Sequence, residues 1–166
     1  MKTFIFLLLV QVCSVSAQEL EMDSTTGKWM YRKVVVLDSM KASDLYERSR
    51  QWIARAYMSA DDVIQYENKE EGKLMGRGYW KMAMSLNNEK KEHVIIIECK
   101  DGRVRYTFTD FVRETYSTTL GRERKPLESI KFMKKSAQNA FALEAAQSGA
   151  ELEKALKPTV KKDDGW

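Results

Sequence analysis

The chain has 166 residues, of which 43% are hydrophobic and 31% charged, and its 28 lysines and arginines against 24 acids give a formal charge of +4. This length fits one ordinary domain and excludes a large multidomain enzyme. The composition is typical of a folded globular protein and excludes a disordered or collagen-like chain. One histidine and two cysteines leave little material for a metal cluster or a histidine-based catalytic site, so we expect no cofactor and no metal.

The first 17 residues have the pattern of a signal peptide. A basic start precedes an apolar run from Thr3 to Val12, and Ala17 supplies a small residue at the end of the segment. We therefore expect cleavage between Ala17 and Gln18 and export of the mature chain to the periplasm or beyond. The apolar run is about ten residues long, shorter than the roughly 20 that a membrane-spanning helix needs. We expect no transmembrane span in the mature chain, and the bulky Val12 before Cys13 disfavours a lipoprotein.

The mature chain is expected to begin with a disordered lead-in over residues 18–28, which are polar and acidic. The run from Trp29 to Leu37 is rich in β-forming residues and predicts a strand. Apolar residues then recur at helical spacing, which predicts a helix from Asp44 to Tyr57 with Ser43 as its N-cap. Turn-forming residues separate four further predicted strands, which are Asp62 to Glu67, Lys73 to Met84, Glu92 to Cys99 and Arg103 to Arg113.

The last two predicted strands form a hairpin whose register follows from its turn. If Asp101 and Gly102 form a two-residue type I′ turn, alternating residues separate one apolar face from one polar face. Cys99 falls on the apolar face, so we expect a small buried side chain and no reactive thiol. Cys13 leaves with the signal peptide, so no disulfide is expected. The expected pairs are Lys100 with Arg103, Cys99 with Val104, Glu98 with Arg105, Ile97 with Tyr106 and Ile95 with Phe108.

A second helix is predicted after a charged turn, because Pro126 suits a first helical turn and apolar residues from Leu127 to Phe141 keep helical spacing. Gly149 is expected to interrupt this helix, and residues 148–166 to form a short helical or loose tail. The predicted domain therefore spans residues 29–147. Its order of strand, helix, four strands and helix predicts an α+β fold, with one antiparallel sheet and both helices on its apolar face.

The polar face of this sheet is the one surface that suggests binding. If the strands stack in register, it carries basic side chains, threonines and one tyrosine, which could hold an acidic peptide, an anionic glycan or another protein. An ordinary solvated face explains the same residues equally well. The residues assigned to this face are Arg77, Tyr79, Lys81, Arg103, Arg105, Thr107 and Thr109. A weaker alternative is contact with anionic lipid headgroups through Lys131, Lys134 and Lys135 of the second helix.

Catalytic chemistry finds little support in the sequence. His93 is expected to be a solvent-facing residue at a strand end, because no second histidine or acid stands at metal-ligand spacing. Asp110 has the parity of the core face and is expected to pair with an arginine or to cap a turn. We therefore predict a non-catalytic binding module. A small envelope enzyme with an unrecognised site is an alternative. A nucleic-acid-binding module is less favoured, because export opposes it and Tyr79 is the only aromatic residue assigned to the polar face.

Four stretches of the chain together resemble a known family, namely residues 43–48, 62–67, 72–78 and 101–110. They are similar to the bacterial envelope domain of unknown function with a TATA-binding-protein-like (TBP-like) fold. The resemblance covers about Val34 to Tyr116 and implies β-α-β4-α order, which agrees with the predicted elements. It brings no catalytic residue. The implied partner is therefore an unknown envelope protein, an acidic peptide or an anionic glycan.

Overall fold

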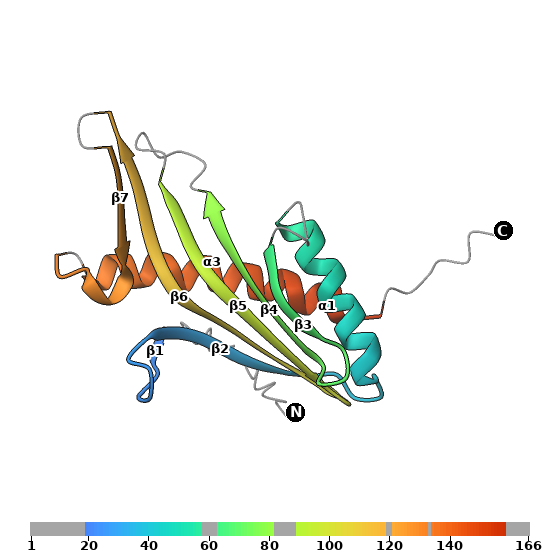
Figure 1. Cartoon of the computed structure of the whole chain (residues 1–166). Coiled ribbons are helices and arrows are strands. Elements are labelled where there is room, and N and C mark those ends of the chain that lie inside the picture. The colour runs from blue at the N-terminus through green and yellow to red at the C-terminus, as the bar shows by residue number, and fades with distance from the viewer. Residues whose placement is uncertain (1–18, 58–62, 82–88, 119–120, 133, 159–166) are drawn as a thin grey trace, which may run out of the picture.

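The computed structural model describes residues 19–57, 63–81, 89–118, 121–132 and 134–158 (Figure 1). The predicted signal peptide and its cleavage site, Ala17 and Gln18, lie outside the described residues. Among the described helices, none is both long enough and apolar enough to cross a membrane. In chain order the elements are β1 (Glu21–Met22), β2 (Trp29–Val36), α1 (Ala42–Ala56), β3 (Ile64–Asn68), β4 (Lys73–Lys81), β5 (Lys90–Lys100), β6 (Arg103–Ser117), β7 (Gly121–Pro126), the 3-10 helix η1 (Leu127–Ser129) and α3 (Lys134–Leu156).

One antiparallel sheet contains all of these strands. Its order is β1-β2-β6-β5-β4-β3, and β7 pairs with β6 on the same side as β2. The two α-helices contact each other and pack against the sheet, and α3 runs behind its central strands (Figure 1). The predicted α+β class, with one antiparallel sheet and two helices, is confirmed. The strands β1 and β7 are additions to the predicted order.

The β5–β6 hairpin has the predicted register. All five expected pairs occur, from Lys100 with Arg103 to Ile95 with Phe108. Its turn is not type I′, however, because only Gly102 has a positive φ, of 73°. The segment before α1 contacts this turn, because the Gly102 N–H donates a hydrogen bond to the Met40 carbonyl at 2.8 Å.

The start of α1 depends on this same turn. The helix begins at Ala42, and its N-cap Lys41 makes no side-chain hydrogen bond. The Ala42 N–H donates instead to the Asp101 carboxylate at 2.8 Å. The predicted cap, Ser43, therefore lies inside the first turn, and a residue far along the chain satisfies the helix end.

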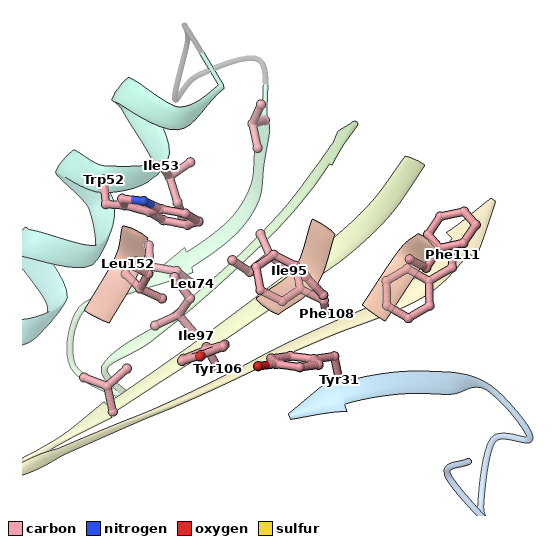
Figure 2. Close-up of a cluster of buried hydrophobic side chains, with 14 of the residues drawn as sticks. Tyr31, Trp52, Ile53, Leu74, Ile95, Ile97, Tyr106, Phe108, Phe111 and Leu152 are labelled. Atoms are coloured by element: carbon pink, nitrogen blue, oxygen red, sulfur yellow. The ribbon is translucent and has the colours of Figure 1, made fainter. Parts of the chain in front are cut away.

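Side chains from the sheet, α1 and α3 meet in one hydrophobic core (Figure 2). Tyr31 stacks on Tyr106 with 6.4 Å between ring centroids, and Tyr106 meets Phe108 edge-on at 6.0 Å. Cys99 is buried there as predicted, with its Sγ 3.7 Å from the Ser49 Oγ of α1. Both described α-helices lie on this face, and the other face of the sheet carries no helix among the described residues.

The segment expected to be a disordered lead-in is folded where the structure describes it. Glu21 pairs with Met30 of β2, and Leu20 packs into the core with 9% of its surface exposed. The Asp23 carboxylate accepts a hydrogen bond from the Thr25 N–H at 2.8 Å and so holds the following turn. Burial of Leu20 and the turn held by the Asp23 side chain therefore order this otherwise polar segment.

The region after β6 also differs from the prediction. Gly121–Pro126, expected as a charged turn, forms β7 and pairs with β6 from Val112 to Ser117. The helix expected at Pro126 is only the short η1, and α3 begins at Lys134. β7 lacks alternating apolar residues because nearly all of its side chains are exposed, so hydrophobic periodicity could not reveal it.

The predicted break at Gly149 does not occur, and α3 continues to Leu156. The glycine faces the sheet, where an added Cβ would lie 2.5 Å from the Tyr106 hydroxyl oxygen. Leu152 and Leu156 beyond it are fully buried. The first part of the expected tail, up to Leu156, therefore belongs to the packed domain.

Asp110 marks a fork in the sheet. It has a φ of 53°, and the pairing of β5 with β6 shifts register beside it, as at a β-bulge. On the other edge of β6, β2 pairs up to Thr109 and β7 takes over from Val112. The Asp110 carboxylate lies 2.9 Å from the Lys28 ammonium, so its partner is a lysine and not the expected arginine.

Candidate functional site on the open face of the sheet

The sheet face turned away from the helices, here called the open face, carries the predicted binding residues. Cross-strand pairing places Arg77, Tyr79, Arg103, Arg105, Thr107 and Thr109 on it. Lys81 belongs to β4, but its side chain lies outside the described part of the structure. The face assignment from strand parity therefore holds for every described member of the set.

The structure does not bring these residues into one site. Arg103 pairs with Val36 and Lys100, whereas Arg77 lies in the row that contains Val94 and Thr109. These two rows are three steps apart, and each step of two residues spans about 6.7 Å. About 20 Å of sheet therefore separates the two predicted arginines along the strands.

The two threonines are not available to a partner. Thr107 is only 5% exposed, and its Oγ accepts a hydrogen bond from the Arg32 Nε at 3.3 Å. The Thr109 hydroxyl donates to the Trp29 carbonyl at 3.1 Å. Both threonine hydroxyls therefore link β2 to β6.

The end of the open face near the β5–β6 turn combines exposed valines with cations. Val34 is 52% exposed and Val36 66%. A hollow of about 250 Å³ is lined by Val34, Glu98, Lys100, Arg103 and Arg105. We call this group, together with Val36, the valine end.

The cations of the valine end differ in their partners. Arg105 binds Glu98 through two hydrogen bonds of 2.7 and 2.8 Å. These bonds lower the pKa of the Glu98 carboxyl and raise the pKa of the Arg105 guanidinium. Lys100 and Arg103 form no salt bridge with any carboxylate among the described residues. The hollow therefore carries an excess of positive charge beside apolar surface.

The valine end also borders a sheet edge. β1 pairs only with Trp29 and Met30 of β2, and no other described strand lies on that side. The Leu37 N–H donates to the Gly102 carbonyl at 2.7 Å, so odd-numbered residues here direct their backbone groups toward β6. Because the backbone N–H and C=O groups of successive residues point to alternate sides of a strand, those of Val34 and Val36 point outward, away from β6.

The opposite end of the open face is an ion network. The Glu114 side chain, 8% exposed, lies 3.6 Å from the Lys90 Nζ and also binds Arg122. The hydrogen bond from Arg122 is the largest influence that lowers the pKa of Glu114. Arg124 binds Glu92 beside it. Each of these three cations contacts one of the two carboxylates, so this end is better explained as a structural link between β7 and the sheet.

Three tyrosines are exposed on the open face, although sequence reasoning placed only Tyr79 there. Tyr66 is opposite Met75 and Tyr116 is opposite Arg122. The alternation of side chains along β3 could have placed Tyr66 on the open face. Tyr116 lies opposite β7, a strand that hydrophobic periodicity does not reveal, so its position could not be predicted. Tyr79 already lies near the Lys90 ammonium, 5.1 Å from its ring centroid.

His93 is the clearest correction to the sequence analysis. It is fully buried on the helix-covered face, where its ring stacks on Trp80 at 3.7 Å between centroids. Its Nε2 lies 2.6 Å from the Tyr57 hydroxyl, and its Nδ1 has no hydrogen-bond partner among the described residues. Burial lowers the pKa of His93 to about 3. The residue is therefore a neutral core group and not a strand-end histidine in solvent.

Within the described ranges, no group of three or more histidine, cysteine, aspartate or glutamate side chains is arranged to hold a metal ion. The candidate site is thus a surface that combines cationic side chains, exposed valines and the outward-pointing backbone groups of the β2 edge. Such a surface can bind an anionic or extended ligand, and it presents no buried polar pocket.

Comparison with known proteins gives a family and a fold. Residues 31–114 match the domain of unknown function DUF4468 with TBP-like fold. A TBP-like protein from Parabacteroides distasonis superimposes with a TM-score of 0.67 at 15% identity, over 81% of this chain and 96% of that one. A DUF4468 family protein from Bacteroides ovatus gives a TM-score of 0.62 at 17% identity, over 89% and 95%. No curated protein matches the sequence.

Proposed function

The chain belongs to the DUF4468 family of domains with a TBP-like fold, and within this family of unknown function we propose that it is a non-catalytic binding module. Its partner is an extended acidic segment of another protein, which binds at the valine end. The observation that carries the proposal is the pair Lys100 and Arg103, two cations without a described carboxylate partner, beside Val34 and Val36. Acidic side chains supply the missing charge, and apolar ones cover the valines.

The outward edge of β2 supports a specific way of binding. Val34 and Val36 offer backbone groups to an added strand, and their side chains lie on the open face, where the cations are. An extended peptide gains main-chain hydrogen bonds at such an edge, and its alternate side chains reach the sheet face. A partner strand with alternating acidic and β-branched residues matches this surface.

The non-catalytic part of the proposal rests on where the reactive groups lie. Cys99 is buried in the core, and burial raises the pKa of its thiol to about 11. His93 is buried and neutral at physiological pH. Neither group can meet a substrate without opening of the core.

We also propose that the protein works in the cell envelope after export, on the strength of its N-terminal sequence. Mass spectrometry of protein purified from a bacterial envelope tests this step. A mature N-terminus at Gln18 is the expected result, and an intact Met1 in the cytoplasmic fraction contradicts it.

The binding mode is tested with a fluorescent peptide of alternating glutamate and valine, followed by anisotropy. Val34→Pro removes the outward N–H of β2, whereas Val34→Thr keeps it and serves as the matched control. We expect Val34→Pro to abolish binding and Val34→Thr to retain it, with thermal melts confirming that both variants fold. Equal binding by the two variants contradicts strand addition.

Charge reversal tests the cationic part of the site. Lys100→Glu with Arg103→Glu should abolish peptide binding, because the acidic side chains then meet like charges. A single-stranded oligonucleotide, run in parallel, tests the nucleic-acid alternative that the exposed tyrosines raise. If the oligonucleotide binds the protein and the peptide does not, the proposed partner class is wrong.

A further inference from the structure

A second surface, on the helical side of the molecule, carries a larger hollow. It lies between the end of α1 and the end of α3 and has a volume of about 580 Å³, which is within the range of small-molecule sites. Its lining residues are Arg48, Gln51, Trp52, Arg55, Ala56, Glu151, Lys154, Ala155, Lys157 and Pro158. The valine end lies on the opposite face of the sheet.

The lining has an unbalanced charge. Four of its side chains are cationic, and Glu151 is the one acid. The Arg48 guanidinium donates to the Lys157 carbonyl at 3.1 Å, and Arg55 donates to the Gln51 side-chain oxygen at 3.4 Å. These arginines thus bind neutral oxygens, and no carboxylate among the described residues forms a salt bridge with them or with Lys154 and Lys157.

This pattern differs from that of neighbouring cations. Arg50, also on α1, lies 2.9 Å from the Glu67 carboxylate, and Lys69 lies 2.7 Å from Glu47. Carboxylates are therefore available near α1 but are directed to the other side of the helix. Within the described part of the chain, these carboxylates form no salt bridge with the cations that line the hollow, which leaves those cations open to an anionic ligand.

The walls of the hollow are fixed by core packing. Trp52 is only 5% exposed and meets Tyr57 edge-on, while Leu152 and Leu156 anchor α3 in the core. Two packed helices therefore hold the arginines and lysines around an apolar floor. Because packing already fixes the helix backbones, only the side chains of the lining have to become ordered when a ligand binds.

We propose that this hollow binds a compact ligand with several clustered phosphate groups. One carboxylate cannot balance four cations, whereas neighbouring phosphates can, and arginine binds phosphate through paired N–H donors. The site is independent of the proposed peptide-binding function. A free polyphosphate and a phosphorylated lipid headgroup share this chemistry, and the experiment separates these two sources.

The test is calorimetric titration of the full chain with inorganic tripolyphosphate. The variant Arg55→Gln/Lys154→Gln removes one arginine and one lysine from the hollow. The variant Arg113→Gln/Lys125→Gln removes the same charges from exposed positions on β6 and β7, outside both proposed sites, and is the matched control. We expect affinity to fall by about tenfold or more in the first variant and by less than about twofold in the second.

Sedimentation with vesicles of phosphatidylinositol bisphosphate in phosphatidylcholine provides the second arm. The proposal is supported if only Arg55→Gln/Lys154→Gln loses binding, in either measurement. Loss in the titration indicates a free polyphosphate as the ligand, and loss in the sedimentation indicates a lipid headgroup. Equal losses in the two variants indicate attraction to net charge and overturn the proposal. Binding of neither probe at concentrations up to about 1 mM also overturns it.

Discussion

The helix-covered face of the sheet and the valine end of its open face differ in how their charged side chains are paired. On the helix-covered face, the Lys91 ammonium is 6% exposed and lies 2.8 Å from Glu144 of α3. The Tyr106 hydroxyl donates to Glu153 at 2.7 Å, and Lys33 binds the same carboxylate. At the valine end of the open face, Lys100 and Arg103 have no described carboxylate partner.

This difference distinguishes cations that stabilise the fold through a paired acid from exposed cations that could contact a ligand. A buried ion that loses its partner destabilises the fold strongly, so buried cations are held by paired acids. An exposed cation is solvated by water and needs no partner for stability. The unpaired cations therefore indicate where binding can occur, and the predictions below test this distinction.

The largest effect is expected at the buried pair. Glu144→Ala leaves the Lys91 ammonium in the core without its carboxylate, which should lower the free energy of unfolding by about 3 kcal/mol. Urea denaturation measures this loss. The double variant Lys91→Met/Glu144→Leu should recover most of it, and Glu19→Ala, which breaks the exposed pair with Lys135, should leave stability unchanged. A small effect of Glu144→Ala would place Lys91 in contact with solvent.

A pH dependence follows from His93, the single histidine of the chain. Its pKa is about 3 when folded, against 6.5 for the unperturbed group, so the unfolded chain binds the proton first as pH falls. The contribution is fully present above about pH 6.5 and declines toward pH 3. Between about pH 6.5 and 4.5 we expect a loss of about 2 kcal/mol, because the slope is about half of its limit of 1.36 kcal/mol per unit at pH 6.5 and approaches that limit at lower pH. His93→Gln should remove this slope in denaturation curves measured across the range.

A smaller effect, of unusual sign, is expected at Gly149. Alanine normally stabilises a helix relative to glycine by up to about 1 kcal/mol. At this position the new Cβ would lie 2.5 Å from the buried Tyr106 hydroxyl, so Gly149→Ala should cost about 1–2 kcal/mol. Ala150→Gly, on the exposed side of α3, is the control and should lose only the helix propensity. Stabilisation by Gly149→Ala would mean that Tyr106 can move aside.

The smallest effect is expected on the open face. Lys100→Gln/Arg103→Gln should change the free energy of unfolding by less than about 0.5 kcal/mol, because neither side chain has a described acidic partner. Differential scanning calorimetry at two salt concentrations measures the change. If this variant lost as much free energy of unfolding as Glu144→Ala, Lys100 and Arg103 would stabilise the fold as the buried pair does, which contradicts the comparison.

The central strands were predictable because their sequence signals are local. Alternation of apolar residues in β5 and β6, together with Gly102 at the turn, specified the register and the burial of Cys99. The same alternation placed His93 beside Ile95 on the core face. The signal for a buried histidine was therefore present, but the predicted strand began at Glu92 and so placed His93 at a strand end, whereas β5 begins at Lys90.

The remaining parts of the fold depend on distant contacts. β7 forms because its polar residues pair with β6 and bind its acids, and the start of α1 is satisfied by Asp101. Asp110 shifts the pairing of β6 with β5 through a positive φ that hydrophobic alternation does not reveal.

The candidate site was predictable only as a face. Strand parity assigned Arg77, Arg103 and Arg105 to the open face correctly. It could not show that Arg32 covers Thr107, or that Val34 lies beside Arg105, because the partner of β2 was unknown. The hollow between α1 and α3 likewise requires the helix packing.

The fork at Asp110 has a consequence for the order in which the sheet assembles. β7 joins β6 through a short hairpin, whereas 75 residues separate Arg32 of β2 from Thr107. Closing the longer loop costs more chain entropy, so β2 should dock after the β5–β6–β7 meander has formed. In amide hydrogen exchange, we expect β2 to open sooner than β5 and β6. The strand with the outward edge would thus be the last to join the sheet, and a bound partner would slow its exchange first.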